Sequence, residues 1–266
     1  MEERLTRTQS RLLEPTQFVV LGGVTALVVM TWFDLWRRAS ETHMHVAMAM
    51  AMPRQAPWDL ADLGSTAVMW GVMMIAMMLP SATPMLVLFA RSQRPRLGPA
   101  EGSWRTGLLA AGYLVVWLGW SVLAAGFQWA LNASLLLSPG AAITSALAGG
   151  ALLVLAGVYQ LSSWKYACLL QCQSPLGFLL ARWRDGRWGA FRMGLAHGVY
   201  CVGCCWALMA LLFVGGVMNL TWIAALAVFV LLEKAVVRGR WYSYASGGGL
   251  VAWGLYVLHA GLLSAS

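Results

Sequence analysis

The chain has 266 residues, of which 60% are hydrophobic and only 11% charged, and its formal net charge is +8. A water-soluble domain carries about 25% charged residues, so the composition excludes a soluble globular protein and indicates an integral membrane protein. The positive charge does not point to nucleic acid, because the basic residues fall between apolar runs instead of forming one patch. The sequence also shows no nucleotide-binding motif.

Seven apolar runs, each near the roughly 20 residues that cross a bilayer, predict an all-α class. We expect a polytopic membrane helix bundle of about seven transmembrane helices, forming one integral membrane domain over residues 1–266. With the N-terminus inside and the C-terminus outside, all but three of the 18 basic residues lie on the cytoplasmic side. The first run is interpreted as a signal-anchor helix. The predicted spans are 17–36, 64–90, 107–131, 141–163, 193–215, 218–237 and 247–264.

The first outer loop, 37–63, contains the histidine- and methionine-rich stretch ETHMHVAMAMAMPRQ. Alternate residues of this stretch share one side if the segment is extended. Thioethers remain usable ligands in an oxidising compartment, and methionine together with histidine selects Cu(I). The alternative is a loop that merely contains methionine. The candidate ligands here are His43, Met44, His45, Met48, Met50 and Met52.

Methionine recurs in the predicted span 64–90, in two stripes on the helix surface. Such a stripe is often ordinary core packing, but its position beside a methionine-rich loop also suggests a ligand role. Pro80 and Pro84 interrupt the hydrogen-bond ladder of this helix, which is tolerated where neighbouring helices satisfy the freed carbonyls. The candidate ligands in this span are Met73, Met77 and Met78.

The segment WKYACLLQCQSP places Cys168 and Cys172 four residues apart, hence on one face of a helix near the cytoplasmic surface. Pro175 should end that helix. Farther along the chain, Glu233 lies beside Lys234 in an apolar run. This carboxylate is interpreted either as functional or as half of an interfacial pair with the lysine.

The predicted span 193–215 carries the densest group of reactive side chains, in the stretch HGVYCVGCCW. At 100° per residue, its histidine and three cysteines share an arc of about 100°. Imidazole and sulfur ligands together suit Cu(I) or Zn(II). The cysteines could instead pack as small apolar residues, or Cys201 and Cys204 could form a redox dithiol. The candidate ligands are His197, Cys201, Cys204 and Cys205.

The segments MMIAMMLPSATPM, YQLSSWKYACLLQCQSPLGF and RMGLAHGVYCVGCCWALMALLFVGGVMNL, with LLEK after them, resemble a bacterial family. It is a family of predicted metal-binding integral membrane proteins of unknown function, and the resemblance covers roughly residues 60–240. It implies a multi-pass, metal-binding protein of a bacterial inner membrane, without supplying a reaction or an ion. The matching candidates are Cys168, Cys172, His197, Cys201, Cys204 and Cys205, with Met77, Met78, Pro80 and Glu233 as further motif positions.

The leading hypothesis is a lipid-embedded protein that handles a soft transition metal, Cu(I) with Zn(II) as the alternative. The ion would be transported across the membrane or delivered to a partner, either a metal chaperone or a metalloenzyme. The second hypothesis is a membrane thiol–disulfide oxidoreductase that uses the Cys201/Cys204 pair. Haem binding by His197 and His259, and a purely structural subunit, are weaker alternatives. The sequence leaves open whether Cys168/Cys172 and the His197–Cys205 group form one site.

Overall fold

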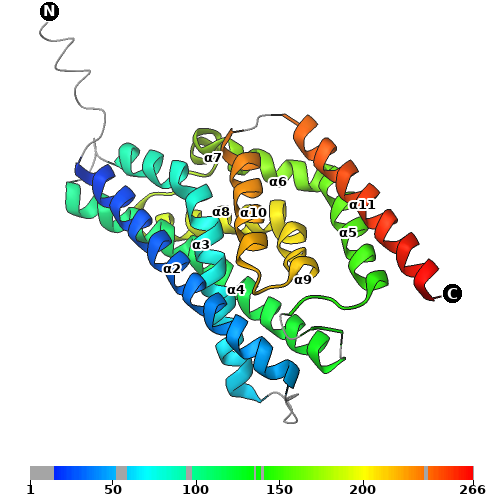
Figure 1. The fold of residues 1–266 in the computed structure, drawn as a ribbon. Helices are drawn as coiled ribbons and strands as arrows, with labels where there is room; N and C mark the ends of the chain where they lie inside the picture. Colours follow the sequence, from blue (N-terminus) through cyan, green and yellow to red (C-terminus); the bar gives the residue numbers. More distant parts are fainter. Residues whose placement is uncertain are drawn as a thin grey trace, which may run out of the picture.

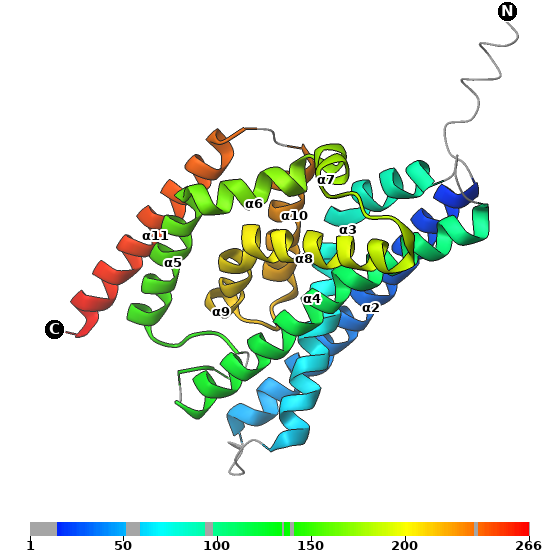
Figure 2. The ribbon, with the colours of Figure 1, turned by 180° about the vertical axis from the view of Figure 1, so that it is seen from behind.

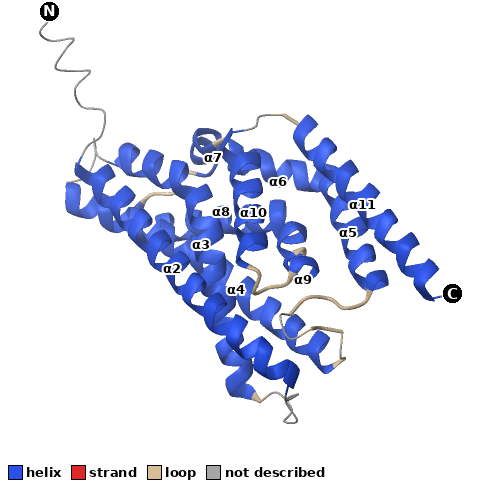
Figure 3. Cartoon of the chain, viewed as in Figure 1, coloured by secondary structure: helices blue, strands red, loops and turns tan. Residues whose placement is uncertain are grey.

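The computed structural model describes residues 15–51, 59–93, 98–134, 136–138, 141–236 and 239–265, and it confirms the all-α class (Figures 1 and 3). Within these residues the only β pairing is one isolated bridge between Leu137 and Ile143. The long helices are α2 (Pro15–Ala51), α3 (Leu60–Gln93), α4 (Pro99–Ala133), α8 (Gly186–Ala210) and α11 (Trp241–Ala265). The shorter ones are α5 (Ala146–Leu161), α6 (Ser163–Gln173), α7 (Pro175–Arg182), α9 (Leu212–Gly215) and α10 (Leu220–Leu231), which continues as the π-helix η1 (Leu232–Val236).

Helices α2, α3 and α4 pack side by side, and α5 pairs with α11 at the opposite edge of the molecule (Figures 1 and 2). Between these two groups lie α8 and α10, with α6 running across one end. Helix α8 contacts α4 on one side and α6 on the other. The cysteine-rich stretch therefore lies in the centre of the bundle and not on its surface.

Among the described residues, five helices are long and apolar enough to cross a membrane. They are α2, α3, α4, α8 together with α9, and α11. A sixth is added if α5 and α6, which meet at 64°, are counted as one broken span. Helix α10 has only 12 residues before it continues as η1. The seven crossings and their orientation stay predictions.

Helix α2 is longer than the first predicted span and corrects the expectation of an extended outer segment. It runs to Ala51, so the backbone from His43 to Met50 is helical. Alanine and methionine are good helix formers, and here their propensity outweighs the alternating pattern. The side chains of residues 42–51 and the whole of Met52 lie outside the described residues. This applies to the candidate ligands His43, Met44, His45, Met48, Met50 and Met52.

The predicted span 141–163 becomes two helices because Ser162 ends one and begins the next. Its side chain accepts a hydrogen bond from the backbone N–H of Lys165, which caps the first turn of α6. Helix α6, which carries Cys168 and Cys172, ends at Gln173. Pro175 then starts α7, so the predicted end of the cysteine-bearing helix is confirmed.

Helix α3 remains continuous through Pro80 and Pro84. A proline at position 80 cannot donate to the carbonyl of Ala76, four residues earlier. That carbonyl instead accepts a hydrogen bond of 3.2 Å from the indole N–H of Trp32 on α2. The expectation that a neighbouring helix satisfies the freed carbonyl is therefore confirmed at this position.

Helices α4 and α8 cross with their backbones in direct contact at Gly112 and Gly194. A Cβ atom added to Gly194 would overlap the carbonyl oxygen of Leu109, and one added to Gly112 would overlap that of Phe191. Glycine is required at this crossing because a methyl group has no room on either side. The crossing brings Tyr113 on α4 toward the cysteine face of α8.

Candidate metal centre

The cysteine groups of α6 and α8 lie together. Cys201, Cys204 and Cys205 are buried on α8, and Cys172 is buried on α6. The Sγ atoms of Cys172 and Cys204 are 3.9 Å apart, and all of these thiols are free. The cysteine part of the predicted arc on α8 thus faces α6, and Cys172 of the second predicted group lies against it.

Helix α3 contributes a thioether to the same place. The Sδ atom of Met78 lies 3.9 Å from Cys205 Sγ. Met73 and Met77 are also fully buried in the core that contains the cysteines. Of the three candidate methionines in this helix, Met78 is the one with a sulfur–sulfur contact to the cysteine group. We call Met78, Cys172, Cys201, Cys204 and Cys205 the sulfur cluster.

A lysine side chain enters the sulfur cluster from η1. The Nζ atom of Lys234 lies 2.9 Å from Cys201 Sγ, 3.6 Å from Cys205 Sγ and 3.8 Å from Met78 Sδ. Only 5% of this residue is exposed. Sequence reasoning treated Lys234 as an interfacial partner of Glu233. Its location among soft sulfur atoms was missed, and the only signal was its place within an apolar run.

Tyr113 is a second residue that sequence reasoning missed. Its hydroxyl lies 3.0 Å from Cys201 Sγ and donates a hydrogen bond of 3.0 Å to the Met78 carbonyl oxygen. The side chain is buried, because the α4–α8 crossing holds it against α8. Tyr113 therefore fixes the positions of Cys201 and of the α3 backbone relative to each other.

His197 lies one residue layer away from the sulfur cluster. Its ring packs against Tyr113 with centroids 5.8 Å apart, and against Phe178 with centroids 5.1 Å apart. The imidazole is buried, and its Nδ1 atom has no hydrogen-bond partner among the described residues. Leaving a buried nitrogen without a hydrogen-bond partner costs folding free energy. A hydrogen-bonding group or a bound ligand at this atom would remove that cost.

Cys168 faces α8 but lies outside the sulfur cluster. Its side chain is half-buried, and its Sγ atom is 2.9 Å from the position that a Cβ on Gly203 would take. The carbonyl of the same glycine accepts a hydrogen bond from the Tyr159 hydroxyl at 2.6 Å. Side chains of both α5 and α6 therefore contact α8 at Gly203.

Glu233 is at the centre of a separate buried polar network. Its Oε1 atom is ion-paired with Lys165 and accepts hydrogen bonds from Gln160 at 2.9 Å and Ser243 at 2.8 Å. Its Oε2 atom has no partner among the described residues. The sequence suggested either a functional carboxylate or an interfacial pair, and the structure replaces the interfacial pair by a fully buried network with Lys165.

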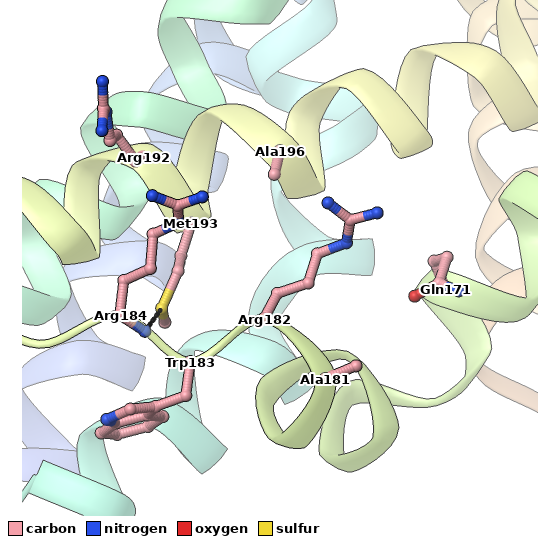
Figure 4. A pocket seen from close by; sticks show the side chains of 8 residues that line it. All are labelled: Gln171, Ala181, Arg182, Trp183, Arg184, Arg192, Met193 and Ala196. Atoms are coloured by element: carbon pink, nitrogen blue, oxygen red, sulfur yellow. Dashed lines mark hydrogen bonds between the residues drawn. The ribbon is translucent and has the colours of Figure 1, made fainter.

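A basic pocket of about 840 Å³ opens between α7 and α8 (Figure 4). Figure 4 shows the guanidinium groups of Arg182 and Arg184 between α7 and α8, with Arg192 on α8 above them. None of these three arginines is ion-paired with a carboxylate in the described part of the chain. The pocket wall also includes Gln171 and Ala196, which adjoin Cys172 and His197 in sequence. We call it the arginine pocket.

The donor set favours a soft cation with few ligands. Within the described ranges, no three His, Cys, Asp or Glu side chains converge as a ready metal site. A metal–sulfur bond of about 2.3 Å, the zinc value, allows two sulfur ligands to be at most about 4.6 Å apart. The Cys172–Cys204 and Cys205–Met78 pairs, at 3.9 Å each, satisfy this limit. A closed tetrahedral zinc site would need four such ligands to converge on one point.

Comparison with known proteins gives one family. Residues 67–257 match the family PpoB2, which is described as a copper chaperone. The match covers the sulfur cluster, His197, the Glu233 network and the arginine pocket. No curated protein and no solved structure matches the chain.

Proposed function

Because the chain belongs to the PpoB2 copper chaperone family, which its residues 67–257 match, we propose that it binds Cu(I) within a membrane and delivers it to a partner. The observation that carries this proposal is the sulfur cluster at the junction of α3, α6 and α8. Thiolate and thioether ligands together select Cu(I) over harder cations. Copper is the cargo of this site, and the proposal assigns the residues of the chain to holding and releasing it.

The sulfur pairs favour Cu(I) over the Zn(II) alternative. Zinc in structural sites takes four ligands in a tetrahedron, whereas the sulfur contacts here come as two pairs, each 3.9 Å apart. Cys172 and Cys204 link α6 to α8, and Cys205 and Met78 link α8 to α3. A cation shared by either pair would also hold two helices together.

A location within the bilayer is supported by the five or six apolar helices. A bare ion is costly in hydrocarbon, and sulfur ligands supplied by facing helices lower that cost. We keep the seven-span topology of a bacterial inner-membrane protein, with the N-terminus inside. The arginine pocket then faces the cytoplasm. The histidine- and methionine-rich end of α2 would receive the ion, and Met73 and Met77 on α3 would line its path to Met78.

The first test is the copper content of the reduced, detergent-purified protein, combined with X-ray absorption at the metal edge. We expect bound copper with sulfur neighbours in the wild type. Replacing Cys201, Cys204 and Cys205 by serine should lower the copper content at least tenfold, because the sulfur atoms that select Cu(I) are lost. Cys168→Ser is the matched control and should retain copper, since Cys168 lies outside the sulfur cluster.

Two outcomes would contradict the proposal. Copper at background level in both proteins would leave the sulfur cluster without a cargo. If the Cys201/Cys204 pair were then oxidised reversibly by a quinone, the thiol–disulfide oxidoreductase would take its place. A copper signal with nitrogen and oxygen neighbours only, unchanged in the serine variant, would place the ion elsewhere in the chain.

Delivery to a partner is assigned to the arginine pocket. Three guanidinium groups without carboxylate partners among the described residues favour contact with an acidic surface, which speeds diffusional encounter. Gln171 and Ala196 in the wall adjoin Cys172 and His197 in sequence, and the proposal is that a partner seated there reaches the bound ion from this side. The partner that fits is a soluble copper protein with an acidic surface around its own cysteine ligands.

Reversing charge in the arginine pocket should slow transfer without weakening binding. We expect Arg182→Glu/Arg184→Glu to lower the rate of copper transfer to an acidic acceptor about tenfold at low salt, and less at high salt. Stopped-flow transfer to a copper-binding acceptor with an acidic surface measures this rate. Arg240→Glu is the control, because this exposed arginine lies outside the pocket. Equal transfer by all three proteins would show that the pocket does not guide the partner.

A further inference from the structure

We propose that the ammonium group of Lys234 is a resident cation of the sulfur cluster, which an incoming monovalent soft ion displaces. This inference rests on the proposed copper function and adds that the site selects a monovalent ion. It is carried by the three contacts of Lys234 Nζ with sulfur atoms, at 2.9, 3.6 and 3.8 Å. These atoms belong to two cysteines and one methionine, which are the ligand types of a Cu(I) site.

Charge balance explains why the ammonium group lies there. Among the described residues, the buried lysine and carboxylate side chains are Lys165, Glu233 and Lys234. Glu233 is already paired with Lys165, so Lys234 has no carboxylate partner in this part of the chain. A buried ammonium group needs an anionic partner nearby. The nearest group able to carry negative charge is the sulfur of Cys201, at 2.9 Å.

The ammonium group therefore holds the sulfur cluster in the arrangement that a cation requires. Cys201 and Cys205 share one face of α8, Met78 lies opposite them on α3, and the ammonium group contacts a sulfur atom of each. A monovalent ion that replaces the ammonium group leaves the net charge of the cluster unchanged. A divalent ion adds one positive charge to a site enclosed by α3, α6 and α8.

The displaced lysine also discriminates between ions. Lys234 is anchored on η1, so its ammonium group stays close to any ion bound in the cluster. Coulomb repulsion between the two is twice as large for Zn(II) as for Cu(I) at the same distance. The resident lysine should therefore favour a monovalent ion and oppose a divalent one, in addition to the preference that sulfur ligands already give.

The test uses the fact that the chain contains only two lysines, Lys165 and Lys234. Protein labelled with ¹⁵N at the lysine Nζ atoms should give two ammonium signals, which Lys234→Met assigns. One equivalent of Ag(I), a redox-inert probe for Cu(I), should shift the Lys234 signal and leave the Lys165 signal in place. Stoichiometric binding of Ag(I) without a shift of the Lys234 signal would overturn the inference.

Affinity measurements give a second, independent readout. For Lys234→Leu, which removes the charge without adding a sulfur ligand, we expect the ratio of Cu(I) to Zn(II) affinity to fall about tenfold or more, because the repulsion that opposes Zn(II) is removed. Lys234→Arg keeps the charge and should keep the preference, and Arg240→Leu controls for loss of an exposed charge. Equal changes in both affinities would contradict the inference. If wild type binds neither Ag(I) nor Cu(I), the proposed function itself fails.

Discussion

Gly194→Ala should destabilise the detergent-solubilised protein by about 3 kcal/mol or more, and copper binding should be lost with it. A Cβ atom at this position would overlap the carbonyl oxygen of Leu109, and this contact is with backbone, which cannot rotate away. The helices α4 and α8 would have to separate. Tyr113 would then no longer hold Cys201 and the Met78 carbonyl together. Thermal unfolding measures the loss of stability, and the copper content of the same preparation measures the loss of binding.

A matched control is available on α4 itself. A Cβ atom at Gly119 would meet no other atom within 4 Å. Gly119→Ala should therefore leave stability unchanged or raise it by up to about 1 kcal/mol, since alanine is the better helix former. Gly112→Ala should behave like Gly194→Ala, because its Cβ would overlap the carbonyl oxygen of Phe191. Wild-type stability in Gly194→Ala would show that the two helices are not in backbone contact.

Glu233→Gln should also lower the stability of the protein, because it removes one partner of a buried ion pair. Its carboxylate pairs with Lys165, and both side chains are almost completely buried. Removing one partner of such a pair leaves an uncompensated charge buried in the protein, at a cost of about 3–5 kcal/mol. The loss should appear as a lower unfolding temperature of the metal-free protein, so that it is separated from any effect on copper.

The double variant Lys165→Met/Glu233→Gln tests whether the unpaired charge of Lys165 causes the loss of stability in Glu233→Gln. With both charges removed, most of the stability lost in Glu233→Gln should return, because neither group is left buried and unpaired. Gln160 and Ser243 would still find an oxygen on the glutamine at position 233. If the double variant is as unstable as the sum of the single ones, the two residues act independently and the network does not work as a pair.

Local sequence patterns were sufficient to predict which cysteines share a face of α8 and where α6 ends. A spacing of three or four residues fixes which side chains share a helix face, and Pro175 cannot continue the helix that carries Cys172. The pattern also placed Met78 among the candidate ligands. It could not separate Met78 from Met73 and Met77, because that choice depends on how α3 is rotated against α8.

Lys234 and Tyr113 show what local patterns cannot provide. Both touch Cys201, yet they come from η1 and α4, which are far from Cys201 in the sequence. The sequence pairs Lys234 with its neighbour Glu233, whereas in the structure Glu233 is paired with Lys165 across the bundle. Which helices are neighbours is decided by close crossings such as Gly112 with Gly194, and one sequence does not reveal those pairings.

Glu233 and Lys234 are consecutive residues of the π-helix, and they connect opposite halves of the molecule. Glu233 is bonded to side chains of α5, α6 and α11, while Lys234 contacts sulfur atoms of α3 and α8. A turn of η1 that withdraws Lys234 from the sulfur cluster must also move the carboxylate of Glu233. If loading turns η1 in this way, the loaded and empty states of the cluster would differ in the packing of α5 against α11, which forms one edge of the bundle (Figure 2).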